Sequence, residues 1–291
     1  MKNIIIALLV SIIAAYITVR VTTTSDVLAP AVTQETAFER VMRTKTLRCG
    51  YAPVGLALQK DPNTGALSGT VYDVMEALGS ALDIKIDWAE EITFGTAMTG
   101  LQSGRYDAVC SNLYARPNWM PHAELSESYQ YVPVNAYVKV GDHRFVTREA
   151  VNRPEVKIAY QDGTVPAFIK KTDFPNAGAL AVVDMDYSDI LLGVATGKAD
   201  ITFVEPAVAE DFMKNNPDKI ELAAAISPLY VFPIVLAVNK GEHSLNSMLS
   251  GAIKYLQNKD SIEMILRKHE KYPGMFWRAA PTYLHPQPLS K

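Results

Sequence analysis

The chain has 291 residues, of which 48% are apolar and 20% are charged, and its formal net charge is −3 at pH 7. These values are typical of a globular protein with one large domain or two domains of ordinary size. The weakly acidic charge and the scatter of the basic residues exclude a nucleic-acid-binding surface, so no nucleic acid is expected as a partner.

The N-terminal 21 residues, MKNIIIALLVSIIAAYITVRV, combine an early lysine with a largely apolar run over residues 4–19. This run is long for the core of a signal peptide and slightly short for a spanning helix, so residues 1–21 are interpreted as a signal peptide or a membrane anchor. Lys2 indicates that the rest of the chain lies outside the cytoplasm. Residues 22–35 are polar and aperiodic, which is typical of a tether.

Helical and strand-like patterns alternate after the tether. A capping-box motif at residues 36–39 predicts a short helix, and the apolar spacing of residues 70–82 predicts an amphipathic one. Strands are predicted at residues 46–52, at residues 83–90 and after Asp107, with a polar hairpin at residues 58–69 and a helix at residues 94–101. This β-α-β-α-β order implies a mainly parallel sheet with right-handed crossovers.

The second half of the chain predicts the same order again. Residues 156–172 read as a strand, a Gly-Thr turn and a helix, and residues 179–185 and 187–196 as the next strand and helix. Residues 230–241 predict a strand that carries the chain back, followed by a pair of helices at residues 244–257 and 261–271.

An internal repeat links the two halves. Residues 100–112, GLQSGRYDAVCSN, and residues 193–205, GVATGKADITFVE, share a helix end, a glycine, a basic residue, an aspartate and an apolar run. Five residues after the aspartate stand Asn112 and Glu205. Because ligands bind at the carboxyl ends of strands in open α/β sheets, the repeat predicts a ligand held between two lobes. The alternative is chance, since the pattern is common in α/β proteins.

Residues 46–271 resemble the type II periplasmic solute-binding proteins that bind amino acids for ATP-driven importers. The resemblance depends on LRCGYAP, TGALSGTVYDVMEALGSAL, TGLQSGRYDAV, SESY before a strand, the Gly-Thr pair, TGKADITFVEP and VLAVNKGEHSLNSMLSGAIKYL. It implies an α/β fold of two Rossmann-like lobes joined by a two-strand hinge near residues 130–134 and 230–235. Lobe 1 would comprise residues 36–131 plus 235–272 and lobe 2 residues 132–234, with residues 273–291 as a C-terminal tail.

The resemblance also implies a ligand-binding site. Glu205 occupies the place of the aspartate that receives the ligand's ammonium, and Gly163 and Thr164 match residues that receive its carboxylate. The usual arginine is replaced by Trp119, whereas Arg116 stands nearby and could either bind the carboxylate or face solvent. The remaining walls are expected from Tyr51, Asn112, Tyr114, Trp119 and Phe203. As sequence alone, an aromatic set of this kind is also typical of a hydrophobic core.

The implied function is that of a periplasmic protein, soluble or anchored to the inner membrane, that delivers a small amino acid, amine or carboxylate to the permease of an ABC importer. A monomer is expected. No cofactor or metal is expected, because no catalytic, phosphate-binding or Cys-His metal motif is found in the sequence. Two alternatives stay open. One is a dehydratase-like enzyme in which Glu205 acts as general acid or base, and the other is a membrane-anchored sensor or accessory protein.

Two cysteines, Cys49 and Cys110, lie in the apolar runs LRCGY and DAVCSN. A disulfide between neighbouring parallel strands would have to meet demanding geometry. Two buried free thiols are therefore the expected state, with a disulfide as the alternative.

Overall fold

The computed structural model describes residues 35–183, 187–272 and 275–278. The predicted leader at residues 1–21, nearly all of the tether at residues 22–35 and most of the tail at residues 273–291 lie outside the described residues. Within the described ranges, no helix has the length and hydropathy needed to cross a bilayer.

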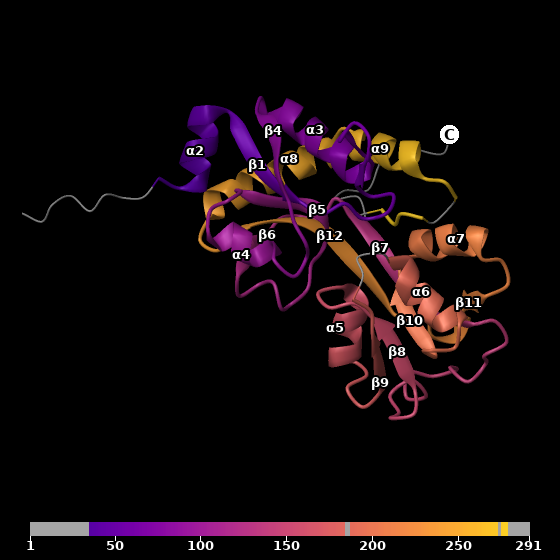
Figure 1. The fold of residues 1–291 in the computed structure, drawn as a ribbon. Helices are drawn as coiled ribbons and strands as arrows, with labels where there is room; N and C mark the ends of the chain where they lie inside the picture. The colour runs from indigo at the N-terminus through magenta and orange to yellow at the C-terminus, as the bar shows by residue number, and fades with distance from the viewer. Residues whose placement is uncertain (1–34, 184–186, 273–274, 279–291) are drawn as a thin grey trace, which may run out of the picture. The chain divides into compact units, whose positions relative to one another are not determined.

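The fold is built on one sheet with the strand order β4-β1-β5-β12-β7-β10-β8-β9 (Figure 1). At one end, β1 pairs in parallel with β4 and β5, and at the other end β8 pairs in parallel with β9 and β10. The strands of the first group are β1 (Thr46–Tyr51), β4 (Lys85–Glu91) and β5 (Ala108–Tyr114). The strands of the second group are β8 (Lys157–Tyr160), β9 (Gly178–Ala181) and β10 (Ile201–Val204).

Each parallel group contains two crossover helices, which confirms the predicted β-α-β-α-β order in both halves. The helices are α3 (Thr70–Leu82) and α4 (Ala97–Gln102) in the first group, and α5 (Val165–Thr172) and α6 (Tyr187–Ala195) in the second. The predicted hairpin is present as β2 (Gln59–Lys60) and β3 (Leu67–Ser68). Helix α4 begins three residues later than predicted, because Thr96 turns back onto Thr93.

Two long antiparallel strands, β7 (Gln130–Lys139) and β12 (Tyr230–Asn239), lie between the parallel groups. They pair with each other from Gln130 to Val134 and from Tyr230 to Ile234. Beyond this segment β12 continues along β5, whereas β7 continues along β10. The backbone therefore passes between the two groups through these two strands, at the positions where the resemblance implies a hinge.

The remaining elements complete the two halves. Helices α8 (His243–Asn258) and α9 (Ser261–His269) return to the first group, where both contact α3, and α2 (Ala37–Thr44) contacts β1 and α8 (Figure 1). The predicted apolar face of α8 is buried at Leu245, Leu249, Ala252, Ile253 and Leu256. Helix α7 (Pro206–Asn215) follows β10, and the short elements are β6 (Ala123–Leu125), β11 (Ile220–Leu222) and η1 (Ala224–Ile226).

The sequence repeat has the same structure in both groups. Gly104 and Gly197 each end a helix with a positive φ, of 70° and 74°, as predicted for a residue without Cβ. The carboxylates of Asp107 and Asp200 each accept the backbone N–H of the neighbouring parallel strand, from Arg48 and Lys157, at 2.8 Å in both cases. The repeated aspartate therefore joins adjacent strands in each group.

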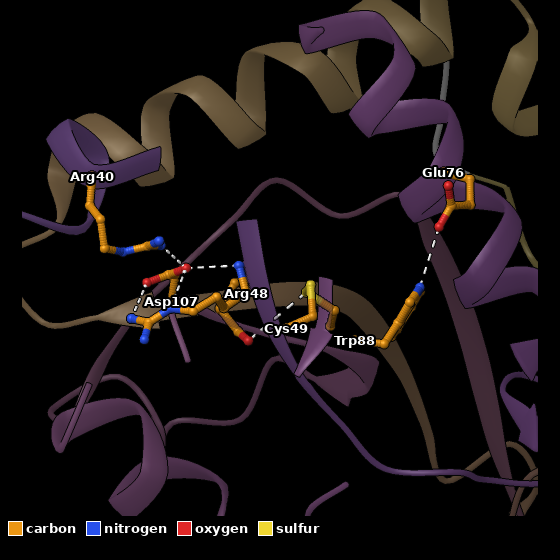
Figure 2. Close-up of a disulfide and its surroundings, with 8 residues drawn as sticks. Arg40, Arg48, Cys49, Glu76, Trp88 and Asp107 are labelled. Carbon is orange, nitrogen blue, oxygen red and sulfur yellow. Dashed lines mark hydrogen bonds and ion pairs between the residues drawn. A yellow bond between two sulfur atoms is a disulfide. The ribbon is translucent and has the colours of Figure 1, made fainter. Parts of the chain in front are cut away.

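Cys49 and Cys110 form a disulfide between β1 and β5, with their Cα atoms 5.4 Å apart. The prediction of free thiols was wrong, because the register of these neighbouring strands brings the two Cα atoms within bonding range. Figure 2 shows the surroundings, in which the side chains of Arg40 and Arg48 converge on Asp107 at the start of the same two strands. The disulfide and this ion-pair cluster thus hold one strand pair together.

We expect Gly100→Ala to lower the free energy of unfolding by about 1–3 kcal/mol. A Cβ at Gly100 would lie 2.3 Å from the hydroxyl oxygen of Tyr106, which is buried and donates a hydrogen bond to the carbonyl of Ala97. Urea unfolding measures the change. The matched control is Gly251→Ala on α8, where a Cβ meets no atom within 4 Å, so that helix propensity is expected to raise stability by about 0.5–1 kcal/mol.

Candidate functional site

A cavity of about 1150 Å³ is lined by residues from both parallel groups and from β7. The first group contributes residues 52–57 after β1, residues 91–95 at the end of β4, and Asn112 on β5. The second group contributes Gln161, Asp162 and Thr164 after β8, together with residues of α6 and α7 and Glu205. These positions follow the carboxyl ends of the strands, where open α/β sheets bind ligands.

Glu205 and Asn112 meet in this cavity, as the repeat predicts. Glu205 directly follows β10 at the N-cap of α7, and its carboxylate Oε1 accepts a hydrogen bond of 3.0 Å from Asn112 Nδ2. The hydroxyl of Tyr114, two residues further along β5, donates to the same oxygen. The two copies of the repeat therefore supply one polar cluster in a shared cavity.

The carboxyl group of Glu205 is enclosed, although part of the residue is accessible. Burial raises its pKa above the ordinary value of 4.5, and the hydrogen bonds from Tyr114 and Asn112 offset this only in part. Burial raises the pKa of the Tyr129 hydroxyl, and the negative charge of Glu205 raises it further. A second phenol therefore lies close enough to interact with this carboxylate. The enclosed site consequently favours the protonated, neutral form of Glu205 more than water does.

We expect Glu205 to make the stability of the unliganded protein fall as pH rises above about 4.5. A carboxyl whose pKa is higher in the folded state binds its proton more tightly there, so its contribution is fully present below the unfolded pKa and is lost as pH passes through the folded pKa. The measurement is the free energy of unfolding in urea at several pH values, for the wild type and for Glu205→Gln. The free energy of unfolding of the wild type minus that of Glu205→Gln isolates the contribution of this group. We expect this value to fall with rising pH, and a value that rises with pH would contradict the expectation.

Two residues that line the cavity carry three buried polar atoms with no hydrogen-bond partner among the described residues. They are Oδ1 of Asn112 and both amide atoms, Oε1 and Nε2, of Gln130, and the two residues are 1% and 0% exposed. Such atoms are rare in folded proteins and indicate a group that binds there. The sequence analysis missed Gln130, and its place at the start of the predicted hinge strand was the available signal.

Arg116 is 5% exposed and does not face solvent, so that expected alternative is wrong. Its Nη1 and Nη2 donate to the carbonyls of Thr164 and Gly163, at 3.2 Å each, and its guanidinium lies 4.7 Å from the ring centroid of Trp119. The structure thus brings together four of the predicted residues, but only Thr164 among them lines the cavity.

Two of the predicted aromatic walls, Phe203 and Tyr51, pack in the core, whereas Tyr114 contacts Glu205. Phe203 is fully buried and stacks on Phe174 at 5.3 Å, and Tyr51 packs edge-on against Trp88 at 5.6 Å. Among the described residues, the aromatic side chains that line the cavity are instead those of Phe94, Phe212 and Phe276. The physical reason is that burial of a large ring within a strand packs it into the core, as the alternative interpretation held.

Part of the predicted tail packs at the same place. Met275 and Phe276 are buried and line the cavity, and Trp277 forms an antiparallel bridge with Tyr131 on β7 through hydrogen bonds of 2.8 and 2.9 Å. Arg278 is fixed by ion pairs with Glu263 and Glu270. Met275 and Phe276 are therefore part of the cavity wall.

The chain is similar to curated proteins over part of their lengths. It is 29% identical over 184 residues to a probable amino-acid ABC transporter periplasmic-binding protein of Sinorhizobium fredii, with 60% of this chain and 59% of that protein covered. It is 24% identical over 213 residues to membrane-bound lytic murein transglycosylase F of Aliivibrio fischeri, with 71% and 41% covered. The chain thus spans less than two thirds of the length of either relative.

The fold is shared with a crystal structure of an ancestral amino acid-binding protein that is described as a precursor of cyclohexadienyl dehydratase. The TM-score is 0.69 at 23% identity, over 81% of this chain and 100% of the other. Residues 47–271 match the sequence model of one family, and this range includes nearly all of both parallel groups, β7, β12 and every cavity-lining residue except Met275 and Phe276. The chain belongs to the bacterial extracellular solute-binding proteins, family 3.

Proposed function

We propose that this protein captures a small polar solute, an amino acid or a related amine or carboxylate, between two lobes and delivers it to an ABC importer in the inner membrane. The observation that supports this most is the cavity lined by both parallel groups, with Glu205 and Asn112 in contact inside it. The relative from Sinorhizobium fredii carries the corresponding transport function in its name.

The proposed lobes are residues 36–131 plus 235–272 and residues 132–234, with a hinge where β7 and β12 pair. Among the described residues, β7 and β12 are the two strands that connect these lobes through the sheet, and a pair of connecting strands is typical of hinge closure around a ligand. The protein is proposed to act in the periplasm as a monomer, with residues 1–21 as a cleaved leader or a membrane anchor. Mass spectrometry of the mature chain distinguishes the two.

A thermal-shift screen of amino acids, amines and carboxylates tests the proposal. A ligand that binds only the folded state stabilises it by about 2.7 kcal/mol at a concentration 100 times its Kd. For a chain of this size such a gain corresponds to a rise in melting temperature of several degrees. If no compound of these three classes raises the melting temperature, solute capture in this cavity is refuted.

A second candidate function is acid-base catalysis by Glu205. The raised pKa of this carboxyl, with the Tyr114 hydroxyl beside it, is the property expected of a general acid. Incubation of the purified protein with each compound that binds, followed by mass spectrometry of the mixture, separates the functions. Recovery of unchanged compound supports binding alone, whereas turnover that Glu205→Gln abolishes supports the enzyme.

A further inference from the structure

The charges that line the cavity have one sign. Among the described lining residues are five carboxylates and no lysine, arginine or histidine; the carboxylates belong to Glu91, Asp162, Asp189, Glu205 and Asp211. Glu91 is paired with Lys60 at 2.6 Å and Asp211 lies 3.8 Å from Lys214, both at exposed positions. The negative potential of the remaining groups attracts cations and repels a ligand carboxylate.

The unpartnered amide oxygens point to the same chemistry. Oδ1 of Asn112 and Oε1 of Gln130 are buried acceptors without a donor among the described residues, and Glu205 lies against the Asn112 amide. Acceptors of this kind match an ammonium or a guanidinium, both of which donate several hydrogen bonds and accept none. The apolar rings of Phe94, Phe212 and Phe276 supply walls for a hydrocarbon chain.

The groups expected to receive a carboxylate are engaged elsewhere. The backbone N–H of Thr164 and its hydroxyl both donate to the carbonyl of Gln161, at 3.2 and 2.5 Å. The Arg116 guanidinium donates to the carbonyls of Gly163 and Thr164, and Arg116 does not line the cavity. An α-carboxylate would therefore meet carboxylates without a compensating cation, and burial of an unpaired charge is strongly unfavourable.

We propose that the solute is an organic cation without a carboxylate, a primary amine or guanidino compound whose N–H groups bind Glu205, Asn112 Oδ1 and Gln130 Oε1. This assignment rests on the proposed function and narrows it. It excludes the zwitterionic amino acids that the resemblance alone implies.

Calorimetric titration of the purified full-length chain tests the proposal with pairs of compounds that differ by one carboxylate. We expect cadaverine to bind at least 10-fold more tightly than lysine, and agmatine at least 10-fold more tightly than arginine. An amino acid that binds as tightly as its decarboxylated partner, or more tightly, overturns the proposal. If a neutral amino acid or a dicarboxylate binds instead, the cation assignment fails while solute capture stands. If none of these compounds binds, the proposed function fails and this inference fails with it.

A variant of Gln130 provides a second readout. We expect Gln130→Met, which keeps the volume of the side chain and removes the two orphaned atoms, to raise the melting temperature of the unliganded protein and to weaken amine binding at least 10-fold. The matched control is Asn246→Met on α8, which removes an orphaned amide oxygen outside the cavity and should leave amine affinity within 2-fold. An unchanged affinity in Gln130→Met would show that this amide does not contact the amine and would refute the proposed binding mode.

Discussion

Replacing Glu205 by glutamine is expected to weaken the best ligand of the thermal-shift screen by about 30- to 3,000-fold. Loss of one partner of a buried, hydrogen-bonded charge pair costs about 2–5 kcal/mol, and each 1.4 kcal/mol is a factor of ten. Glutamine keeps an amide oxygen that can accept from Asn112 Nδ2 and from the Tyr114 hydroxyl. The substitution therefore removes the charge and keeps the hydrogen bonds.

The same variant is expected to leave the unliganded protein as stable as the wild type at pH 7, or more stable. Burial disfavours the carboxylate of Glu205, which its raised pKa records, so a neutral amide at this position avoids that penalty. Glu210→Gln is the matched control, because it changes the same charge on the following helix at a residue that does not line the cavity. Affinities are measured by calorimetry and stabilities by urea unfolding. A large loss of stability in Glu205→Gln with unchanged affinity would assign Glu205 a structural role.

Both parallel groups could be predicted from the sequence because their signals are local. Gly104 and Gly197 need a positive φ, and Asp107 and Asp200 each bond to the next strand, so the same short pattern recurs wherever that structure does. The contact between Asn112 and Glu205 followed from equal offsets within this repeat. A short sequence pattern was therefore sufficient to predict those features whose conformation or hydrogen bond depends on a few neighbouring residues.

The other parts of the site depend on long-range contacts that leave no local pattern. Gln130 is buried where β7 pairs with β12, opposite Ile234, and a single glutamine in the sequence does not indicate that pairing. The direction of Arg116 is set by carbonyls of a loop in the other parallel group. The disulfide depended on strand register, which the sequence predicts only loosely.

Removing the disulfide is expected to lower the free energy of unfolding by about 2–4 kcal/mol. Cys49 and Cys110 are separated by 61 residues, and a cross-link over a loop of this length restricts the unfolded chain strongly in the loop-entropy description. Both cysteines are fully buried in the core of the first parallel group, so alanine substitutions also leave a small volume unfilled. The double variant Cys49→Ala/Cys110→Ala should therefore unfold at lower urea concentration than the wild type.

A reducing agent provides the matched control for this prediction. It should shift the unfolding midpoint of the wild type toward that of the double variant, and it should leave the variant unchanged, since the described residues contain no other cysteine. The Asp107 cluster with Arg40 and Arg48 joins the same two strands and remains intact, so the variant is expected to fold and to bind solute with the wild-type affinity. A double variant as stable as the oxidised wild type would contradict the prediction. It would show that the Asp107 cluster, and not the disulfide, stabilises the pairing of β1 with β5.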